Sequence, residues 1–593
     1  MSVDRSNKIS SGEAAQKKKD IAVEIANTFE WLITAFILAF VFRAFIMEAF
    51  RIPTGSMADT LKGAHFRLCC EQCGYNYSHG FTPEAYIFCP HCGYICGFNL
   101  VREKNMRCPQ CMNIYTYPER YRLKQDTIPA RSVDLPHTRC PSCSYERGYD
   151  RFSRRKMPVA NGDRILVLKC IYQFVEPKRW DVIVFKNPLD PTENYIKRLI
   201  GLPGEKIEII DGDIYVDGRI QRKPPKVQNE LWTVVYDHDY QPIRPMEGTF
   251  AGHPWWRPLS NDSDSMWLID DQDNPTLAHL AGDTEQINTL VYQTPGGKDF
   301  KAGYSYNDVD PRREDDMPEC SDLMVRFYAE SDIAAGRPVD SQRSIGITLR
   351  KYQTSYSAWV NSKNEMVIAK VGQDKQLVEL KRKQILSMNV NKPMLVKFAN
   401  IDHQLIFEFG REKLTYDLGS GPNDIGPRET GTEPRVKIFG AGRLTLSHIA
   451  IFRDIHYTSE KTASGKDLGR ATEGNPFTLA KDEFFVLGDN SPNSEDGRWW
   501  STRGVANNGL YYRPGIVPRD YLVGKALFVY WPSGFEFPWP ENVKTYLLSR
   551  SRQNSLMRIA NGATSLRWIP NVGQMRFIYG GSNKEPEDKY GGE

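Results

Sequence analysis

The stretch EAFRIPTGSMADTL, residues 48–61, leads an extended apolar segment into a serine at a tight bend. Pro53 has a fixed φ and disfavours helical geometry at the residue before it, so the approach is predicted to be extended. Gly55 then permits a sharp turn in front of Ser56. A serine at the end of a strand, with the Thr54 hydroxyl two residues before it, is a candidate nucleophile beside an oxyanion donor. Most Gly-Ser pairs are ordinary turns, so this stretch by itself does not establish a nucleophile.

The composition is that of a globular protein with several domains. The chain has 593 residues, of which 40% are hydrophobic and 25% charged. These values are ordinary for globular proteins, and the length allows about three to four domains. The net charge of +4 is small for this length, which predicts no nucleic-acid partner.

An apolar run follows a basic N-terminal segment. The run WLITAFILAFVF, residues 31–42, would cover only about 18 Å as a helix, whereas a hydrocarbon core is roughly 30 Å thick. A helix over residues 21–47 is long enough to cross the hydrocarbon core if the side chains of Glu30 and Arg43 reach toward opposite interfaces. We therefore predict one transmembrane helix over 21–47, a cytoplasmic basic tail over 1–20, and the rest of the chain outside the cytoplasmic membrane. A buried or interfacial helix is the alternative, and a removable signal peptide fits less well because no A-x-A-like site follows the run.

Eight of the 12 cysteines form four C-x-x-C pairs within residues 65–156. Two turns that each offer two thiolates to one tetrahedral ion are typical of a zinc ribbon. We predict two structural zinc sites, one formed by Cys70, Cys73, Cys89 and Cys92, and a second formed by Cys108, Cys111, Cys140 and Cys143. Disulfides are the alternative, because the predicted topology places this block outside the cytoplasm. Four protein ligands leave no open position, so neither site is expected to be catalytic.

The rest of the chain is predicted to be mainly β. Residues 157–225 contain short apolar runs separated by Gly, Pro and Asp turns, which indicates antiparallel strands. Lys197 lies in one such run, YIKRLIGL, where strand alternation could also point it to solvent. Residues 226–458 carry longer strands rich in Trp and Tyr and are predicted to form a separate β-sandwich. Short strands and turns like those of 157–225 resume over 459–545, and a polar tail follows over 546–593.

Three separated motifs suggest a family. They are PTGSM (53–57), NGDRILV (161–167) with YIKRLIGLPGE (195–205), and GDNSPNSEDGR (488–498). In this order behind an apolar helix, they resemble the motif set of the bacterial type I signal peptidases, which are membrane-bound serine/lysine proteases. The resemblance implies an antiparallel β core formed by residues 48–64, 157–225 and 459–545. It does not cover the cysteine block or the sandwich, which would be insertions.

The resemblance also implies roles for individual residues. Ser56 matches the nucleophile and Lys197 the general base, while the Thr54 hydroxyl joins the Ser56 N–H in the oxyanion hole. Ser494 matches the serine that hydrogen-bonds and orients the lysine. Supporting positions in the same motifs are occupied by Asp163, Arg198, Gly488, Asp489, Asn490, Asp496 and Arg498, the last two as an ion pair. Gly497 stands where the family commonly has serine, which puts one supporting hydrogen bond in doubt.

The chemistry requires a neutral lysine. At its reference pKa, about 10.4, a lysine is almost fully protonated at neutral pH and cannot accept a proton. Burial disfavours the charged form and lowers that pKa, and the apolar neighbours Ile196, Leu199 and Ile200 could supply the burial. No cofactor is then needed for catalysis.

The resemblance implies signal-peptide-bearing precursors as substrates and the lipid bilayer as a partner. Phe50, Ile52 and Met57 would form a β-edge and shallow pockets that select small side chains at A-x-A sites. The sandwich resembles a concanavalin or laminin-G type domain, which suggests a carbohydrate or protein ligand or a purely spacing role. The alternatives are a catalytically idle membrane-anchored binding protein, a self-cleaving repressor with the same dyad, and a zinc-ribbon nucleic-acid binder. The presence of Ser56, Lys197 and Ser494 together argues against the idle binding protein. The apolar helix argues against the repressor, and the small net charge argues against the nucleic-acid binder.

Overall fold

The structure, a computed structural model, is mainly β strand, which confirms the predicted fold class. It describes residues 24, 26–81, 86–88, 95–97, 105–107, 114–116, 132–133, 138–147, 157–188, 191–241, 249–250, 253–254, 258–269, 276–280, 286–293, 299–307, 316–330, 344–372, 376–386, 392–428, 433–461, 467–501, 503–505, 511–532 and 572–581.

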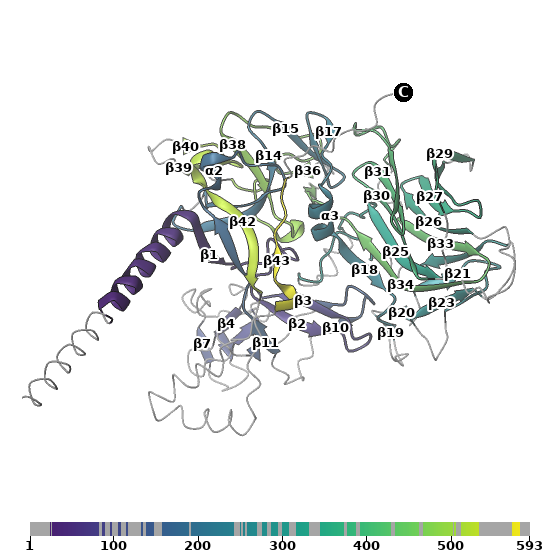
Figure 1. The fold of residues 1–593 in the computed structure, drawn as a ribbon, viewed down its shortest axis with the longest axis horizontal. Helices are drawn as coiled ribbons and strands as arrows, with labels where there is room; N and C mark the ends of the chain where they lie inside the picture. The colour runs from purple at the N-terminus through teal and green to yellow at the C-terminus, as the bar shows by residue number, and fades with distance from the viewer. Residues whose placement is uncertain are drawn as a thin grey trace, which may run out of the picture.

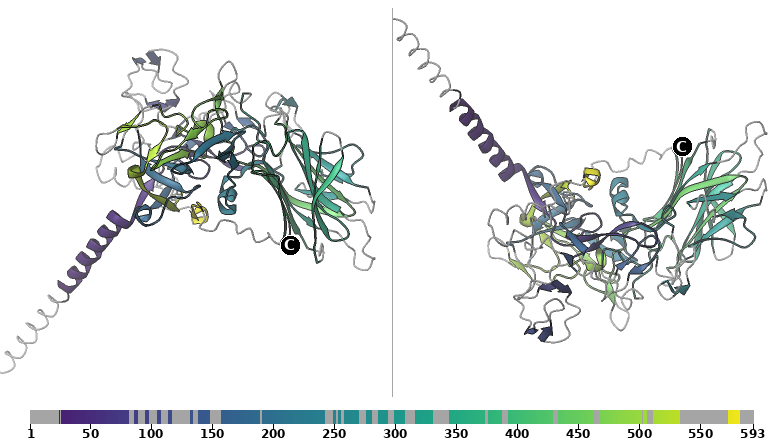
Figure 2. Two further views of the ribbon diagram at one scale, coloured as in Figure 1. Left: turned by 90° about the horizontal axis from the view of Figure 1, so that it is seen from above. Right: turned by 90° about the horizontal axis from the view of Figure 1, so that it is seen from below.

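An apolar helix, Ala26–Ile46, precedes the first strand and ends in a π-helical turn, η1 (Phe42–Ile46). Its mean hydropathy is 2.0 and it projects from the rest of the protein without being buried (Figures 1 and 2). Its 21 residues span about 32 Å, so the helix is long and apolar enough to cross a membrane. Lys169 holds the helix end against the first sheet, because its N–H donates to Ile46 O and its Nζ to Ala44 O.

The central sheet carries all three motifs. Its strands are antiparallel and lie in the order β1 (Met47–Arg51), β12 (Arg164–Leu168), β42 (Leu522–Trp531), β13 (Val182–Lys186), β14 (Asn194–Gly201), β38 (Glu483–Leu487) and β41 (Val517–Pro518), with β43 (Arg576–Phe577) beside β42. Strand β1 leads into residues 53–57, β14 contains Lys197, and β38 leads into residues 488–498. Segments far apart in the sequence therefore meet at one sheet.

Apolar side chains cover both faces of this sheet. Val182 and Val184 of β13 pack with Ile52 and Met57, whereas Ile183, between them, packs on the opposite face in a cluster that contains Trp500. This alternation is what a strand buried on both faces requires. A smaller sheet, β17 (Arg219–Ile220), β16 (Asp213–Val216), β15 (Lys206–Ile210) and β37 (Phe477–Thr478), lies next to it.

Two antiparallel sheets form a β-sandwich, seen at the right of Figure 1. The first has the order β22 (Trp267–Leu268), β23 (Leu277–Leu280), β34 (Leu444–Arg453), β25 (Leu323–Glu330), β30 (Met394–Ile401), β31 (Gln404–Phe409) and β32 (Glu412–Asp417), with β18 (Thr233–Asp237) paired to β34. The second has the order β21 (Leu259–Asn261), β24 (Asn288–Tyr292), β33 (Arg435–Ala441), β26 (Ser344–Lys351), β27 (Thr354–Val360), β28 (Glu365–Val371) and β29 (Leu377–Gln384). Their facing residues, such as Val325 and Ile347, share one buried apolar cluster.

The described residues of the cysteine block form short antiparallel strands. Cys70 and Cys73 lie in the turn between β2 (His65–Cys69) and β3 (Asn76–Gly80), and Cys140 and Cys143 lie between β9 (Thr138–Arg139) and β10 (Glu146–Arg147). The other short elements are β4 (Tyr86–Phe88), β5 (Ile95–Gly97), β6 (Asn105–Arg107), β7 (Ile114–Thr116), β8 (Ser132–Val133), β11 (Met157–Ala160), β19 (Thr249–Phe250), β20 (His253–Pro254), β35 (Glu460–Lys461), β36 (Asp467–Leu468), β39 (Gly504–Val505), β40 (Tyr511–Tyr512), α2 (Ile171–Phe174), α3 (Pro225–Leu231), η7 (Ser491–Asn493), η8 (Arg519–Tyr521) and η9 (Val572–Gln574).

Part of the segment predicted to be a tail returns to the central sheet. Strand β43 pairs with β42, and the Gly581 N–H donates to Asp181 beside it. A Cβ at Gly580 would collide with Asp181 Oδ1, so the chain passes too close to the sheet for a larger residue. The sequence shows no strand signal here, because a two-residue strand has no detectable alternation.

A buried network of charges joins the sandwich to the central domain. Lys223, which precedes α3, forms ion pairs with Asp402 and Asp454 of the sandwich, and all three side chains are almost completely buried. A second buried pair, Lys351 with Asp322, lies beside them, and Asp213 of β16 completes the cluster. Two lysines therefore neutralise part of the charge of the buried carboxylates.

Replacing Lys223 with alanine should destabilise the protein. The change leaves Asp402 and Asp454 without their buried counter-ion, which we expect to lower the free energy of unfolding by about 3 kcal/mol. The exposed pair Lys437 with Asp262 is a matched control, and Lys437→Ala should cost less than about 1 kcal/mol. Denaturant unfolding measures both. Equal effects from the two variants would show that the buried network does not hold the two domains together.

Candidate active site

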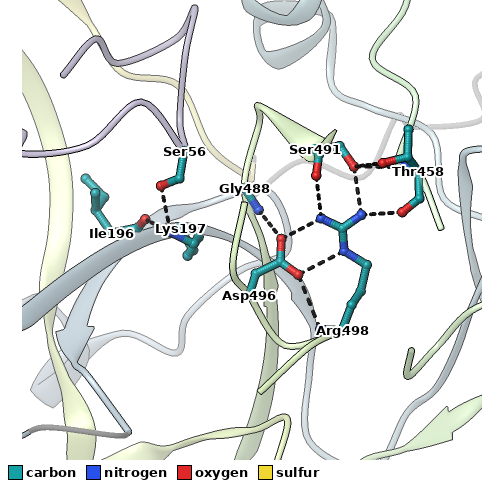
Figure 3. A network of polar contacts seen from close by, with 8 residues as sticks. All are labelled: Ser56, Ile196, Lys197, Thr458, Gly488, Ser491, Asp496 and Arg498. Carbon is teal, nitrogen blue, oxygen red and sulfur yellow. Dashed lines mark hydrogen bonds and ion pairs between the residues drawn. The ribbon is translucent and has the colours of Figure 1, made fainter. Parts of the chain in front are cut away.

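Ser56 and Lys197 come into contact although 141 positions separate them in the sequence. Lys197 Nζ lies 2.7 Å from Ser56 Oγ and also donates to the Ile196 carbonyl at 3.3 Å (Figure 3). Both side chains are buried. A nucleophile and a base within hydrogen-bond distance are the arrangement that nucleophilic catalysis requires.

The position of Lys197 in β14 explains its burial. Every residue of this strand from Ile196 onward is buried, and Lys197 pairs with the buried Ile183 of β13. The alternative that Lys197 points to solvent is therefore wrong. Strand alternation could not exclude it, because alternation indicates solvent only where one face of a sheet is exposed.

Burial lowers the pKa of Lys197 to about 8. Loss of hydration is the largest cause, while the nearby carboxylates Asp496, Glu495 and Asp489 oppose it and Arg498 adds to it. At this pKa an appreciable fraction of the lysine is neutral near pH 7.5, so Nζ can accept a proton from Ser56.

The turn before Ser56 approaches the sandwich. A Cβ at Gly55 would collide with Cε1 of Tyr306, so glycine is needed here because of this close approach. The Thr54 hydroxyl is 3.5 Å from Ser56 Oγ, at the outer limit of a hydrogen bond. Thr54 is exposed, whereas Ser56 is buried.

Ser494 lies close to Ser56 but does not form the expected hydrogen bond with Lys197. Its Oγ is buried and has no hydrogen-bond partner among the described residues. A Cβ at Gly488 would collide with Ser494 Oγ and would lie 2.5 Å from the Ser56 carbonyl oxygen, so glycine allows the two segments to meet. Instead, Lys197 Nζ donates to Ser56 Oγ and to the Ile196 carbonyl.

Asp496 and Arg498 form a fully buried, bidentate ion pair with donor–acceptor distances of 2.9 and 2.8 Å. Asp496 also accepts the Gly488 N–H, and Arg498 donates to the hydroxyl and the carbonyl of Ser491 (Figure 3). Thr458, where the sandwich segment ends, accepts a further hydrogen bond from Arg498. The ion pair therefore connects both ends of the 488–498 loop to the sandwich.

Two other motif residues, Arg198 and Asp163, hold segments next to the Ser56–Lys197 pair. Arg198 makes a bidentate pair with Asp489 at 2.8 and 2.7 Å, entirely within the protein. Asp163 accepts the Lys62 N–H with its carboxylate, and its backbone carbonyl accepts the Ile52 N–H. Asp163 thus joins the two ends of the 52–62 segment that contains Ser56.

The three residues expected to bind substrate belong to one apolar cluster. Ile52 and Met57 are buried in it, and the half-buried Phe50 packs against it. Their role in substrate selection stays a prediction.

The predicted pairing of the cysteines is wrong. Cys70 and Cys73 lie beside Cys140 and Cys143, with all four Sγ atoms within 4.8 Å of one another. Both turns have the same geometry, since Gly74 N–H donates to Cys70 O and Ser144 N–H to Cys140 O. The prediction failed because it joined neighbours in the sequence, whereas the outermost hairpins meet in space. Cys89, Cys92, Cys108 and Cys111 lie outside the described residues.

The four-cysteine cluster could hold a metal ion. The Sγ atoms of Cys70 and Cys143 are 3.6 Å apart, and those of Cys73 and Cys140 are 3.7 Å apart. A tetrahedral zinc ion with Zn–S bonds of about 2.3 Å requires S···S distances of about 3.8 Å. The four thiols therefore fit a zinc ion, and they are free rather than joined as disulfides.

Sequence reasoning missed the contribution of the sandwich segment to this site. Asn307 exchanges two hydrogen bonds with the side chain of Asn490, at 2.8 and 2.7 Å. Tyr306 packs against Gly55. These residues carry no motif, and only their position in space connects them with Ser56.

Comparison with known proteins supports the relationship that the motifs indicate. The family described as "Signal peptidase, peptidase S26" matches residues 154–255 and 440–531, which include Lys197 and the 488–498 loop. Proteins named "Signal peptidase I" from Rickettsia canadensis and Rickettsia typhi are 43% identical to this chain over 100 residues. The predicted resemblance to the type I signal peptidases is confirmed. The match covers 16% of this chain and 36% of each relative, so the chain spans about a third of the length of these signal peptidases.

Two solved structures are similar to part of this chain. The carbohydrate-binding module CBM66 from Bacillus subtilis covers 33% of this chain at 9% identity and a TM-score of 0.19, with 92% of that module aligned. The exoplasmic/lumenal domain of VIP36 covers 40% of this chain at 7% identity and a TM-score of 0.23, with 93% of that domain aligned. At these TM-scores the likeness supports no conclusion about ligands.

Replacing Lys197 with methionine should stabilise the protein. Burial holds the pKa of Lys197 in the folded state near 8, below the unfolded value of 10.5. The folded state therefore loses stability as the pH falls from 10.5 to 8, because protonation of the buried amine is unfavourable. Below pH 8 the full destabilisation is present. Methionine has a similar length and no charge, so we expect the melting temperature at pH 7 to rise by several degrees, roughly the shift that 1 to 2 kcal/mol produces. The gain should shrink toward pH 10.5. Thermal unfolding at several pH values measures this, and a gain independent of pH would contradict the burial of a titrating amine.

Proposed function

We propose that this protein is a membrane-bound signal peptidase that removes N-terminal signal peptides with a Ser56/Lys197 dyad. The 2.7 Å contact between Ser56 Oγ and the buried Lys197 Nζ is the observation that carries this proposal. The S26 family match and the named relatives add support, because the matched residues include the lysine motif and the serine loop. Ser56 lies outside the matched ranges, so its role depends on the geometry.

In the proposed mechanism the neutral Lys197 amine accepts the Ser56 hydroxyl proton as Oγ attacks the scissile carbonyl. The negative oxygen that forms is stabilised by the Ser56 N–H and the Thr54 hydroxyl. The protonated lysine then gives its proton to the leaving amine, and an acyl-enzyme remains on Ser56. A water molecule, deprotonated by Lys197, hydrolyses this ester. Substrate in the site would exclude water and favour the neutral lysine further.

We propose that the dyad lies near the membrane surface, because few residues separate it from the apolar helix. Ser56 follows the end of the apolar helix at Ile46 by ten residues, from 46 to 56. A precursor whose own apolar segment is still in the bilayer would present its cleavage site at this height. We propose that the N-terminus is cytoplasmic and that the catalytic domain lies on the extracytoplasmic side of the inner membrane, because the basic residues precede the helix. Small side chains in an A-x-A pattern would be selected near Phe50, Ile52 and Met57.

We also propose that Cys70, Cys73, Cys140 and Cys143 bind a structural zinc ion. Four thiolates complete a tetrahedral site and leave no position for a substrate, so the ion would tie the two hairpins together without taking part in proteolysis.

Cleavage of a precursor with an A-x-A site by the detergent-solubilised full-length protein tests the dyad. We expect the wild type to cut after the second small residue, and Ser56→Ala to be inactive. Lys197→Arg should also be inactive, because arginine keeps its proton at any accessible pH. Lys206→Arg, at an exposed position on β15, is the matched control and should retain full activity. Full activity of Lys197→Arg would exclude the dyad, and an inert wild type on several precursors would favour the idle binding protein.

Metal analysis of the purified protein tests the zinc site. We expect Cys70→Ser and Cys143→Ser each to lower bound zinc by one equivalent per chain, because both remove a ligand from the same ion. Cys320→Ser, which removes a buried cysteine that does not belong to the cluster, should leave the zinc content unchanged. Zinc loss from Cys70→Ser without loss from Cys143→Ser would contradict the shared site.

A further inference from the structure

Residues 299–307 of the sandwich segment connect the cysteine hairpins with the nucleophile. At one end, the buried carboxylate of Asp299 accepts hydrogen bonds from Arg139 at 2.9 Å and from Ser144 at 2.5 Å. These two residues flank the turn that contains Cys140 and Cys143. Tyr292 of β24 donates a third hydrogen bond to Asp299 at 2.9 Å, which anchors this end on the sandwich as well.

The other end of this segment packs against the turn before Ser56. The Tyr306 carbonyl accepts the Gly80 N–H of β3 at 2.7 Å, and the Tyr306 hydroxyl donates to the Ala64 carbonyl at 3.2 Å. The Tyr306 ring contacts Gly55 so closely that a Cβ there would clash. Tyr306 is buried, and the residue after it, Asn307, reaches the serine loop.

The side-chain amide of Asn307 is hydrogen-bonded to the side-chain amide of Asn490. The two amides exchange hydrogen bonds, with Asn307 Nδ2 donating to Asn490 Oδ1 at 2.8 Å and Asn490 Nδ2 donating to Asn307 Oδ1 at 2.7 Å. The second Nδ2 hydrogen of Asn490 is donated to the Gly55 carbonyl at 3.0 Å. Asn490 is fully buried, and its backbone N–H donates to the Ser56 carbonyl at 3.0 Å.

The Gly55 carbonyl and the Ser56 N–H belong to the same planar peptide group and point in opposite directions across it. A hydrogen bond that holds this carbonyl therefore also sets the direction of the Ser56 N–H. That N–H is the backbone donor of the proposed oxyanion hole, whose effect depends on a preset orientation. The contacts run from Asn307 to Asn490 and from Asn490 to the peptide group before Ser56.

We propose that Asn307 is a positioning residue that orients the Gly55–Ser56 peptide group through Asn490, and that the sandwich thereby supports the oxyanion hole. Asn307 touches no reacting atom. Because residues 299–307 are held at their far end by the cysteine hairpin, both the sandwich and the cysteine block support the nucleophile. The catalytic part of this inference rests on the proposed function, whereas the ordering of the Ser56 loop does not.

Hydrogen exchange tests the ordering without any proteolysis. In full-length Asn307→Ala we expect faster exchange in peptides that cover residues 55–61 and 488–494, since Ala58 N–H is bonded to the same Gly55 carbonyl. Asn307→Asp keeps the acceptor but places a carboxylate oxygen against Asn490 Oδ1, and should give at least the same increase. Asn423→Ala, at an exposed asparagine of the sandwich segment, is the matched control and should show no change. Unchanged exchange in both Asn307 variants would overturn the inference, whether or not the wild type is an active peptidase.

Precursor cleavage by the same variants tests the catalytic consequence. We expect Asn307→Ala to lower kcat about tenfold with little change in KM or melting temperature, because the lost interaction acts on transition-state stabilisation. A fall in melting temperature with unchanged kcat would indicate a merely structural role and overturn the proposal. A change in KM with unchanged kcat would overturn it as well. An inert wild type would instead contradict the proposed function, and the exchange result would still decide whether Asn307 orders the loop.

Discussion

The buried contact between Ser56 and Lys197 is the interaction on which the proposed active site depends. A lysine that serves as a base has to be kept out of water, and the central sheet does this by burying β14 on both faces. Ser56 lies in the turn after β1, and this turn brings its hydroxyl to Lys197 of β14. The position of β14 between β13 and β38 places the 488–498 loop beside both residues.

The same neighbourhood contains carboxylates that would work against a neutral lysine. Asp489 and Asp496 both raise the pKa of Lys197, yet burial outweighs them and the pKa falls to about 8. Each of these carboxylates has its own arginine, since Asp489 pairs with Arg198 and Asp496 with Arg498. Because both pairs are bidentate and buried, the lysine is not needed as a counter-ion. The two ion pairs thus hold the loop and limit its charge.

The sandwich and the cysteine hairpins are structurally integrated with the central domain. Lys223 joins the sandwich to the central domain through buried ion pairs, and Arg498 bonds to the Thr458 carbonyl where the sandwich segment ends. The hairpin that contains Cys140 contacts Asp299, and residues 299–307 extend from there to the turn before Ser56. The sandwich and the cysteine hairpins are therefore both linked by direct contacts to the turn before Ser56.

Features that depend on local pattern and residue type were predictable from the amino-acid sequence. Apolar length indicated the helix, alternation and turn residues indicated a mainly β chain, and the motifs around Ser56, Lys197 and Ser494 indicated the family relationship. Which hairpins meet was settled only by the tertiary structure, so the partners of Cys70, the return of β43 and the contact of Asn307 with Asn490 were not predictable. Each of these contacts joins segments that are far apart in the sequence, and sequence separation does not indicate which distant segments lie close together in space. Only the tertiary structure shows that the Lys197 side chain points into the protein, because burial of a strand on both faces depends on what packs against the sheet.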